Sequence, residues 1–526
     1  MARTGASSAF EAGNAKMSAG SLEEAVAFYD QALAEKPDHL FALFNRGQAL
    51  KKLQRLDAAA ESFALAIALR PTQVQLYEIC GGFLMELDRL EEALQALRQG
   101  LEIAPQSIKI LVLLTTSLFR LQRYDEALVH GQVANGLRPH DPQITNLVGG
   151  ILFCLRRYDE SIPVLEEAAA LNAGLFKAHF NLALALSLAG LTERALAEFE
   201  KSLALRPEHG KSRLNRAICQ MKLGDFEMGW RGYQDRRDYS THYDQVGYGA
   251  PEWVGAEDIK NKTILVHAEF GLGDTIQFCR YVPLLEKAGA KVLLAPQPKI
   301  RTLMRSLSPT IDIVDAADAS LQFDHHCRMM SLPLAFGTTV ETIPASGPYL
   351  MADPKRVTHW KKVIGQRGFK VGVCWRGSKI GDEKGLSFAA SDLADLAAIS
   401  SVRLISLQKS EAPEELAALS SQTWIEAMLD PSDLSENGML DTAALISVCD
   451  LVISCDTSIA HLAGALGRPT WVVMPVDGDW RWLDRRPDSP WYPTMRLFRP
   501  TLLGSRQGVF EAVEAELRLL LNDRVD

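Results

Sequence analysis

The sequence has little of what marks a membrane or secreted protein. No apolar run approaches the roughly 18 residues that a membrane helix requires, and the N-terminus, MARTGASSAFEAGNAKM, has no apolar core that could serve as a signal peptide. The eight cysteines include no C-x-x-C pair, so neither a zinc site nor a disulfide framework is indicated. The net charge of −9 argues against nucleic acid as the main partner. We therefore expect a cytoplasmic protein with no membrane span, metal or cofactor.

The chain is too long, at 526 residues, for one hydrophobic core, and two or three domains are expected. Hydrophobic residues make up 47% of it and charged residues 23%, which is typical of a folded globular protein and not of a disordered one. The two halves differ in pattern: the first is periodic, and the second alternates strands with helices.

Proline recurs at a fixed interval in the first half. Pro37, Pro71, Pro105 and Pro139 are 34 residues apart, and Pro207 follows after 68. A period of 34 residues is that of the tetratricopeptide repeat, a pair of helices. Proline suits the places where one helix pair stops and the next begins, because it cannot continue a helix.

Other positions keep the same period. Small residues recur in every unit: Ala25, Ala59, Ala93, Ala127, Ser161 and Ala195. Larger residues follow four positions later, with Gly131 as the exception: Tyr29, Phe63, Leu97, Leu165 and Phe199. Glycines mark a close approach inside the helix pairs: Gly13, Gly47, Gly81 and Gly149. The register predicts six full repeats, from about residue 6 to residue 208. A seventh, atypical unit follows to about Arg237, and its Trp230 and Tyr233 are predicted to join the array to the next domain.

A solenoid of helix pairs presents a long concave groove, and such grooves usually hold extended peptide. The alternative is that the array only spaces or dimerises the second half. Six repeats make a larger surface than a spacer needs, so we favour a groove that captures a protein.

The second half reads as a doubly wound α/β structure. Residues 238–262 are polar, with glycine and proline, and are interpreted as a linker. A strand is expected at Thr263–His267 and a helix at Asp274–Ala288; further strands are expected at Lys291–Ala295, Ile311–Val314, Gln322–His325, Val371–Trp375 and Val402–Leu407. Two successive series imply two lobes, residues 263–345 and 346–526, after a repeat region of residues 6–237. Ligand should bind in the cleft at the carboxyl ends of the strands.

The first candidate motif follows the strand expected at Thr263–His267. It reads EFGLGD, residues 269–274, and Gly271 and Gly273 would let a substrate approach the backbone closely. It fails the dinucleotide-binding fingerprint, because Ile276 stands at the third glycine position. Asp274 would lie at the mouth of the cleft as a proton acceptor; alternatively, it only caps the helix.

The second candidate motif lies within Leu451–Pro475, which reads LVISCDTSIAHLAGALGRPTWVVMP. The pattern predicts a buried strand, a helix of small residues from Ser458 to Leu466 that is closed by Gly467, and another strand. Asp456, Thr457 and Ser458 stand at the junction between strand and helix. Unpaired N–H groups and the helix dipole favour an anion there, although Asp456 or Thr457 could be an ordinary N-cap.

Two further groups of residues contain types that bind phosphates or metals. Arg376, Lys379 and Lys384 follow the strand Val371–Trp375 and could neutralise phosphates, or they could be solvated surface charges. The run DHHC at residues 324–327 contains metal-ligand types, but neighbours on one strand point to opposite faces and no second ligand group accompanies them. No metal site is predicted.

The motifs GLGDTIQFCRYVPLL and DTSIAHLAGALGRPTWVVMP resemble those of the family 9 glycosyltransferases, which include the lipopolysaccharide heptosyltransferases. The resemblance covers roughly residues 263–521 and implies a GT-B fold of two Rossmann-like lobes. The join to repeats, with FDHHCRMMSLPLAFGT and GDWRWLDRRPDSPWYPTMRLFRP, looks like a bacterial branch in which the two are fused. The arrangement is also similar to the O-linked N-acetylglucosamine transferases and to the repeat-bearing flagellin glycosyltransferases.

The resemblance implies roles for individual residues. The catalytic aspartate of the family falls on Asp274, and its Asp-Thr-Gly-x-x-His segment falls on residues 456–461, with Ser458 where the heptosyltransferases usually have glycine. The donor-binding residues predicted in this way are Gly271, Gly273, Arg376, Lys379, Lys384, Asp456, Thr457, Ser458 and His461. Taken from the helix pattern alone, His461 is more simply explained as structural.

The implied reaction is inverting, metal-independent transfer of a sugar from a nucleotide-sugar donor. Asp274 would act as general base, while the helix at Ser458, aided by a cation, stabilises the leaving phosphate. A protein acceptor held by the repeats is expected, and flagellin is the specific acceptor that the resemblance suggests. The alternatives are a binding scaffold whose transferase domain has lost activity, and a transferase that acts on a glycolipid or polysaccharide.

Overall fold

A computed structural model describes residues 5–239, 248–377, 386–408, 425–427, 438–500 and 506–523. The chain forms two compact units, Met1–Ala185 and Leu186–Asp526. The first is an α-solenoid, and the second contains the last repeats and an α/β domain with two parallel sheets. The predicted fold class is confirmed.

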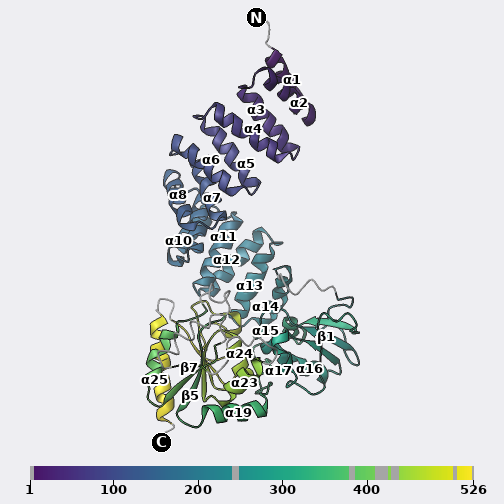
Figure 1. The fold of residues 1–526 in the computed structure, drawn as a ribbon, viewed down its shortest axis with the longest axis vertical. Helices are drawn as coiled ribbons and strands as arrows, with labels where there is room; N and C mark the ends of the chain where they lie inside the picture. The colour runs from purple at the N-terminus through teal and green to yellow at the C-terminus, as the bar shows by residue number, and fades with distance from the viewer. Residues whose placement is uncertain are drawn as a thin grey trace. The chain divides into compact units, whose positions relative to one another are not determined.

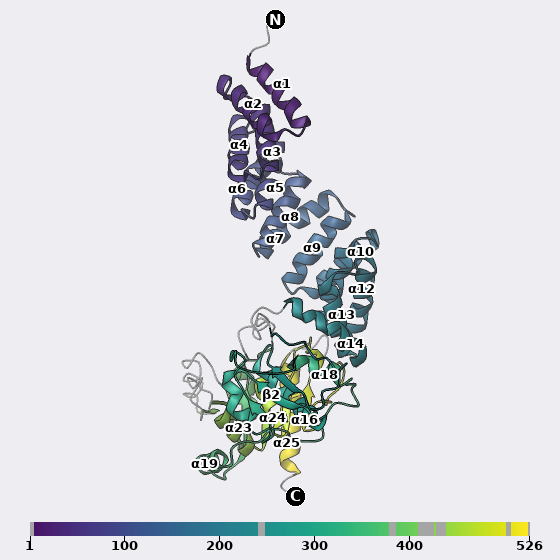
Figure 2. The same cartoon turned by 90° about the vertical axis from the view of Figure 1, so that its right-hand side faces the viewer.

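The first unit consists of paired helices that follow one another in chain order (Figures 1 and 2). They are α1 (Gly5–Ser18), α2 (Leu22–Glu35), α3 (Leu40–Lys52), α4 (Leu56–Leu69), α5 (Val74–Glu86), α6 (Leu90–Ile103), α7 (Ile108–Arg120), α8 (Tyr124–Leu137), α9 (Pro142–Cys154), α10 (Tyr158–Leu171) and α11 (Phe176–Leu188), which ends in the second unit. The periodic prolines 37, 71, 105 and 139 lie in the turns between pairs, as predicted.

The glycines of the repeat register lie against the large residues of the partner helix. A Cβ atom placed on Gly47 would lie 2.8 Å from the Phe63 ring, and one on Gly81 would lie 2.5 Å from Leu97. Contacts that short would force the facing side chain to move, so glycine suits the places where these helices cross. In each pair the large residue stands 16 positions after the glycine.

The exception at Gly131 has a simple explanation in the packing. At this crossing Thr115 occupies the usual glycine position, and glycine occupies the usual large position. A Cβ on Gly131 would lie 3.3 Å from the Thr115 methyl group. The larger and smaller residues have therefore exchanged sides, and the space between the helices is still filled.

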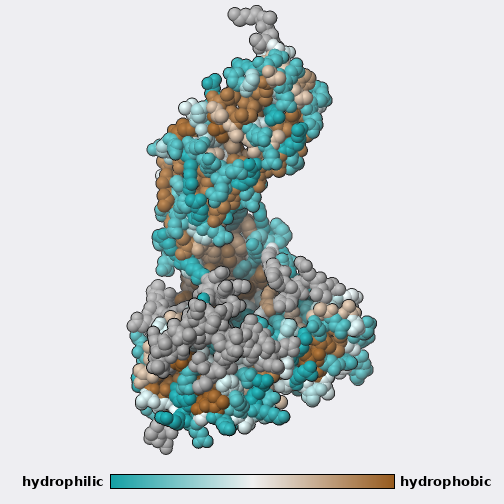
Figure 3. Space-filling model, in the orientation of Figure 1, coloured by the Kyte–Doolittle hydropathy of each residue, from teal (hydrophilic) through white to brown (hydrophobic). Residues whose placement is uncertain are grey.

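Arginines precede the second helix of four pairs in the first unit, at Arg55, Arg89, Arg123 and Arg157, and form a ladder along it. Arg89 donates to Asp57 of the preceding repeat at 3.1 Å and to Glu92 of its own helix at 2.7 Å. Arg123 repeats this arrangement with Glu91 at 3.6 Å and Glu126 at 2.6 Å. On the face drawn in Figure 3, hydrophilic residues cover much of the repeat helices, with apolar residues between them.

The second unit begins with α12 (Thr192–Leu205), α13 (Gly210–Lys222), α14 (Phe226–Tyr233) and the 3-10 helix η1 (Gln234–Tyr239). Trp230 of α14 is fully buried, with its ring centroid 5.2 Å from that of Trp480 and 6.4 Å from that of Phe278. Its indole N–H donates to the Thr338 carbonyl at 2.9 Å. The seventh helix pair therefore packs into the α/β domain through its aromatic residues, as predicted.

The first sheet has four parallel strands in the order β3-β2-β1-β4. They are β1 (Thr263–His267), β2 (Lys291–Ala295), β3 (Asp312–Ile313) and β4 (His325–Arg328). The chain runs outward from β1 to β3 and returns on the other side of β1 as β4. The carboxyl end of β1 therefore lies at the point where the strand order reverses, which is where such sheets bind ligands.

The second sheet has six parallel strands in the order β10-β9-β8-β5-β6-β7. They are β5 (Phe369–Cys374), β6 (Val402–Ser406), β7 (Ile425–Ala427), β8 (Leu451–Cys455), β9 (Thr470–Val473) and β10 (Met495–Phe498). Counted from β7, this is the strand order of the doubly wound dinucleotide-binding sheet. Its order reverses between β5 and β8, so the loops that follow these two strands lie together.

Helices cover both faces of the second sheet (Figure 1). On one face, Val513 of α25 (Arg506–Asn522) packs with Val371 and Ile453 of the strands. On the other face, Ala443 of α23 (Gly438–Val448) packs in the cluster that contains Val452. Among the residues that the structure describes, the other helices are α15 (Leu272–Phe278), η2 (Cys279–Tyr281), α16 (Val282–Lys287), η3 (Pro298–Ile300), α17 (Arg301–Met304), η4 (Met329–Ser331), α18 (Leu332–Ala335), α19 (Pro354–Ile364), η5 (Ala390–Leu393), α21 (Ala394–Ala397), α24 (Ser458–Ala465) and η6 (Trp480–Trp482).

Several predicted elements begin or end at other residues in the structure, and two of these differences have a visible cause. The helix expected over Asp274–Ala288 is interrupted by η2 between α15 and α16, because Pro283 has no N–H to donate to the carbonyl four residues earlier. The strand expected at Gln322–His325 begins only at His325. Before the strand begins, the Asp324 carboxylate accepts a hydrogen bond from the backbone N–H of Thr263 at 2.8 Å.

Part of the segment interpreted as a linker lies beside the first sheet. Trp253 is buried, and its backbone N–H donates to the His326 carbonyl at 2.7 Å. Glu252 forms a parallel bridge with His326, and its carboxylate accepts from Arg328 at 2.8 Å. Residues 251–253 therefore extend the edge of the sheet next to β4.

Candidate functional site

Asp274 lies in the first turn of α15, directly after β1. Gly271 is the N-cap of this helix, and its N–H donates to Asp274 Oδ2 at 2.8 Å. The other oxygen, Oδ1, accepts from Arg481 Nη2 at 2.5 Å. The Asp274 side chain is 20% exposed, so the carboxylate is fixed by two donors but still reaches solvent.

The second motif forms the turn from β8 into α24. Thr457 is the N-cap, and its hydroxyl accepts from the Ile459 N–H at 3.3 Å. The N–H groups of the first turn have no partners within the helix, so this end attracts anions. Gly467 follows the helix with φ +67, the left-handed conformation that terminates helices and favours glycine.

The two motifs come from different lobes and lie in contact. A Cβ atom placed on Gly273 would lie 2.9 Å from His461 Cδ2 and 3.5 Å from Ser458 Cα. Glycine is therefore needed at position 273 because α24 passes directly over it. This close approach places the Asp274 turn beside the helix end at Ser458.

Arg481 ties the two lobes together at this point. It lies in η6, in the loop after β9, and one guanidinium nitrogen donates to Asp274 while another donates to Asp479 at 2.7 Å. The guanidinium lies over the Trp480 ring, 4.3 Å from its centroid. Burial opposes the charged form, but the two carboxylates outweigh it and raise the pKa of Arg481. Arg481 is therefore a fixed cation facing Asp274.

His461 is held as a neutral ring. Its Nδ1 lies 2.9 Å from the Tyr492 hydroxyl, and its ring stacks on Trp482 with centroids 5.2 Å apart. Burial, together with the charge of Arg481, lowers the pKa of His461 to about 3. At neutral pH this ring is a packing and hydrogen-bonding group and carries no charge.

The pKa of Asp456 is shifted in the opposite direction, upward. Burial raises the pKa of its carboxyl to about 7, and the neighbouring charge of Asp479 adds to the effect. For Asp479 itself, burial also acts to raise the pKa, but the charge and hydrogen bonds of Arg481 prevail and lower it. The site thus contains a fully ionised carboxylate and one that titrates near neutrality.

Arg376 lies at the carboxyl end of β5, beside this turn. Gln408 Oε1 accepts from its N–H at 3.0 Å, and Gln408 Nε2 donates to its carbonyl at 2.9 Å. A Cβ on the next residue, Gly377, would lie 3.2 Å from the Thr457 methyl group. The other two predicted cations, Lys379 and Lys384, lie outside the described residues.

Sequence reasoning did not assign roles to several residues that complete the site. Asp479, Arg481, Trp482 and Tyr492 all come from the loop after β9. The signal that could have found them is the density of aromatic and charged residues in GDWRWLDRRPDSPWYP, which a plain surface loop would not carry.

One histidine of the DHHC run, His326, lies against a second histidine from β1. His326 Nδ1 lies 3.3 Å from His267 Nε2, and both rings lie near Tyr248, with centroids 5.0 and 4.7 Å away. Within the part of the chain that the structure describes, no three His, Cys, Asp or Glu residues are grouped as metal ligands would be. Among the same residues, no helix combines the length and apolar character needed to cross a membrane.

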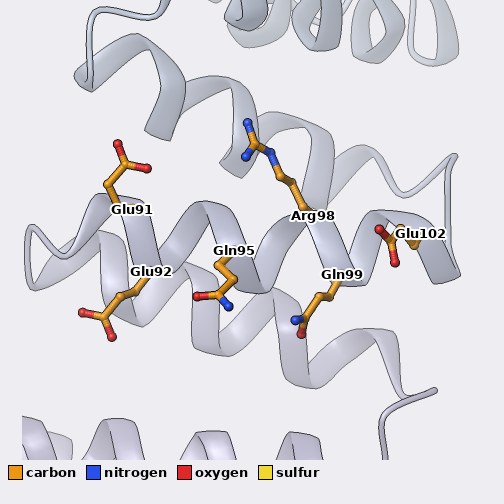
Figure 4. A pocket seen from close by; sticks show the side chains of 6 residues that line it. All are labelled: Glu91, Glu92, Gln95, Arg98, Gln99 and Glu102. Carbon is orange, nitrogen blue, oxygen red and sulfur yellow. The ribbon is translucent and has the colours of Figure 1, made fainter.

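A hollow of about 480 Å³ lies elsewhere, over α6 of the first unit. Figure 4 shows that its six lining residues belong to one helix: Glu91, Glu92, Gln95, Arg98, Gln99 and Glu102. Glu92 pairs with Arg89 and Glu91 with Arg123. The hollow is therefore part of the solvated ion-pair ladder and offers no reactive group.

Comparison with known sequences finds a family match in each half of the chain. Tetratricopeptide-repeat families match residues 10–74, 75–107 and 151–208. Glycosyltransferase family 9 (heptosyltransferase) matches residues 401–473, which include the turn at Asp456–His461 but not Asp274. The chain is 26% identical over 390 residues to protein FlbA of Caulobacter vibrioides, a match that covers 69% of this chain and 64% of FlbA.

Solved structures are similar to parts of this chain. One is YrrB, described as a TPR protein with an unusual peptide-binding site, at 20% identity and TM-score 0.31 over 35% of this chain and 95% of YrrB. Another is MamA from Desulfovibrio magneticus RS-1, at 20% identity and TM-score 0.28 over 31% of this chain and 92% of that one.

Proposed function

Because the chain joins tetratricopeptide repeats to a glycosyltransferase family 9 domain, we propose that it transfers a sugar from a nucleotide-sugar donor to a protein acceptor. The observation that carries this proposal is the contact between Gly273 and the helix turn Ser458–His461. It brings a carboxylate from one lobe next to an anion-binding helix end from the other. A transferase needs these two groups together, one for the hydroxyl and one for the leaving phosphate.

The proposed reaction is a single displacement with inversion. Asp274 accepts the proton of the acceptor hydroxyl while the hydroxyl oxygen bonds to the anomeric carbon of the sugar. The bond from that carbon to the donor phosphate breaks, and the nucleotide leaves with the electron pair. Each Asp274 oxygen keeps a further lone pair beside the bonds from Gly271 and Arg481, so the carboxylate can still take a proton.

The leaving nucleotide would lie at the amino end of α24. The free N–H groups at Ser458 and the positive end of the helix dipole would stabilise its phosphates, and Arg376 would add a cation from the loop after β5. Losing one such preorganised donor typically costs about 2.7–4 kcal/mol in the transition state. No metal is required in this scheme, so turnover should continue in excess chelator.

The donor proposal is tested first by a thermal-shift screen of nucleotide sugars with the full chain. A ligand that binds only the folded protein raises its melting temperature. Ser458→Glu places a carboxylate at the helix end and should weaken binding of the selected donor more than tenfold by calorimetry. Unchanged affinity in that variant would show that the donor binds elsewhere.

The role of Asp274 is tested by Asp274→Asn, which keeps an acceptor for the Gly271 N–H. Transfer should fall by roughly a hundredfold or more, because general-base catalysis typically contributes that much, while donor affinity stays close to wild type. Asp392 offers a matched control: it accepts from the Ala389 N–H at 3.0 Å in the same capping geometry, away from the cleft. Asp392→Asn should leave transfer unchanged. Full turnover by Asp274→Asn would remove Asp274 from the mechanism, whereas no transfer by the wild-type chain would favour the scaffold alternative.

The acceptor is proposed to be a protein because a transferase acting on a small sugar or glycolipid needs no array of repeats. A protein held near the site gains effective concentration. Incubating the full chain with labelled donor and cell extract should label a discrete protein, with flagellin as the first candidate. Label confined to lipid would contradict this proposal.

A further inference from the structure

The loop of residues 476–492, which follows β9, carries the groups that face the candidate site. Arg481 donates to Asp274, Trp482 stacks on His461, and the Tyr492 hydroxyl bonds the same histidine. The loop therefore contacts the predicted residues of both lobes. What holds the loop in place also determines where Arg481 and Asp274 meet.

One residue of the last repeat holds the 477–484 part of this loop at both ends. Lys222, at the end of α13, is 5% exposed, and its ammonium pairs with the Asp477 carboxylate. Its carbonyl accepts from the Asp484 N–H at 2.9 Å. Burial acts to lower the pKa of Lys222, but the Asp477 charge prevails and raises it, so the ammonium stays charged. Thr192 of α12 adds a bond from its hydroxyl to Asp484 Oδ2 at 2.5 Å.

The middle of the 477–484 span is held from the same side. The Trp480 ring packs against Trp230 and Tyr233 of α14, with centroids 5.2 and 5.5 Å apart. The Arg481 guanidinium in turn stacks on the Trp480 ring. Leu483 has φ +51, a left-handed conformation that is costly for a branched side chain and persists only where its surroundings enforce it. The span is therefore strained and clamped by α12, α13 and α14.

We propose that Lys222 is a positioning residue for the candidate site: by fixing both ends of residues 477–484, it holds Arg481 against Asp274. The placement of Arg481 rests on the structure alone, and the catalytic meaning of Asp274 rests on the proposed function. In this view the last repeat is part of the active-site scaffold. A movement of α13 changes the setting of the carboxylate across the cleft.

Hydrogen exchange on the full chain tests the connection without any donor. In Lys222→Met the ammonium is lost, and we expect faster amide exchange in residues 477–486 and also in residues 271–278 of the opposite lobe. The matched control is Lys201→Met, since the Lys201 side chain is 59% exposed and its ammonium pairs with Glu198 within α12. That control should leave both segments unchanged. Faster exchange confined to α13 and residues 477–480 would overturn the proposal, because Lys222 would then be only a local contact.

A second variant guards against misfolding. Lys222→Gln combined with Asp477→Asn removes both buried charges and keeps two amides that can bond each other. It should fold and reproduce the faster exchange in residues 271–278 at a smaller amplitude, because the clamp is weakened without leaving an unpaired charge. Wild-type exchange in that segment would also overturn the proposal.

Turnover separates positioning from simple packing. With UDP-, GDP-, CMP-, dTDP- and ADP-sugars as probes, Lys222→Met should lower kcat at least tenfold and Lys222→Arg should restore most of it. Equal losses in the Met and Arg variants would contradict a role for the ion pair. If the wild-type chain turns over none of the probes, the proposed function fails, while the exchange experiment still decides the position of Arg481.

Discussion

The helix pairs of the first unit and the seventh pair in the second unit follow the same register but have different surroundings. Position 233 continues the series of large residues, and position 229 the series of small ones. A Cβ on Gly229 would lie 2.3 Å from Met221, so the crossing of α13 and α14 is as close as in the earlier pairs. In a solenoid each helix pair packs one of its faces against the following repeat. Here that face, with Trp230, packs on α15 and η6 instead.

The ion pairs of the two regions also differ in their surroundings. Along the first unit, arginines such as Arg89 and Arg123 make exposed pairs that repeat from unit to unit. Around the seventh pair, Lys222 and Arg481 are buried, and each faces carboxylates from another element. Exposed pairs contribute little, whereas removing one partner of a buried pair leaves an uncompensated charge. A shared helical register therefore does not imply a shared role.

The largest expected effect comes from cutting the chain on either side of the seventh pair. Removing residues 1–171 leaves α11–α14 in place, and the remainder should stay soluble and unfold cooperatively. Removing residues 1–237 also takes away Trp230 and Lys222, exposes their apolar partners, and should give no cooperative unfolding transition. Calorimetry of the two fragments checks this. A folded second fragment would show that the seventh pair is an ordinary repeat.

A titration compares the buried charges with the exposed ladder. The unfolded chain loses the Asp456 proton near pH 4, the ordinary range for aspartate, whereas the folded chain holds it until pH about 7. Between these values the folded state binds the extra proton, so stability falls as pH rises from about 4 to about 7 and is then constant. Asp456→Asn should remove this loss and be more stable than wild type by on the order of 4 kcal/mol at pH 8, because the pKa shift of about three units corresponds to about 1.4 kcal/mol per unit.

The comparison must be made between variant and wild type at each pH. His461 acts in the opposite direction: its pKa is lowered to about 3, so its contribution is present above the ordinary value of histidine and is lost as pH falls toward 3. This contribution cancels when the two proteins are compared under the same conditions. Urea unfolding at pH 4.5 and pH 8 provides the measurement, and an equal difference at both values would contradict the expected titration.

The exchanged crossing in the first unit gives an intermediate effect. Gly131→Leu alone should destabilise the chain by about 1–3 kcal/mol, since it forces extra volume against Thr115 and Val148. Combining it with Thr115→Gly restores the arrangement of the other pairs and should recover most of the loss. The free energy of unfolding of the double variant decides the matter: additive losses would mean that the two positions do not share the space.

The smallest effect is expected from the ladder. Arg89→Ala removes exposed pairs with Asp57 and Glu92, and no resolvable change in the unfolding midpoint is expected in moderate salt. Arg481→Ala, which removes a buried cation between two carboxylates, is the counterpart and should lower the midpoint clearly. Equal effects would remove the distinction between the two regions.

The sequence by itself determined the architecture. Its 34-residue period sets helix pairs, because small residues must recur wherever two helices cross closely. Its apolar runs, separated by Gly-containing turns, set the parallel strands, and Asp274 and Asp456 stand directly after β1 and β8 for that reason. These patterns are local or periodic, so they can be recognised in the sequence alone. Pro283 could also have been used to predict the break between α15 and α16.

Only the tertiary structure decided which residues meet. The contact of Gly273 with His461 joins residues from two lobes, and the pairs of Arg481 with Asp274 and of Lys222 with Asp477 span more than two hundred positions. No local pattern encodes such distances, because an arginine in a loop looks the same whether it faces solvent or a carboxylate. The shifted pKa values of Asp456 and His461 likewise follow from burial, which arises when the two lobes and the last repeat close around the site.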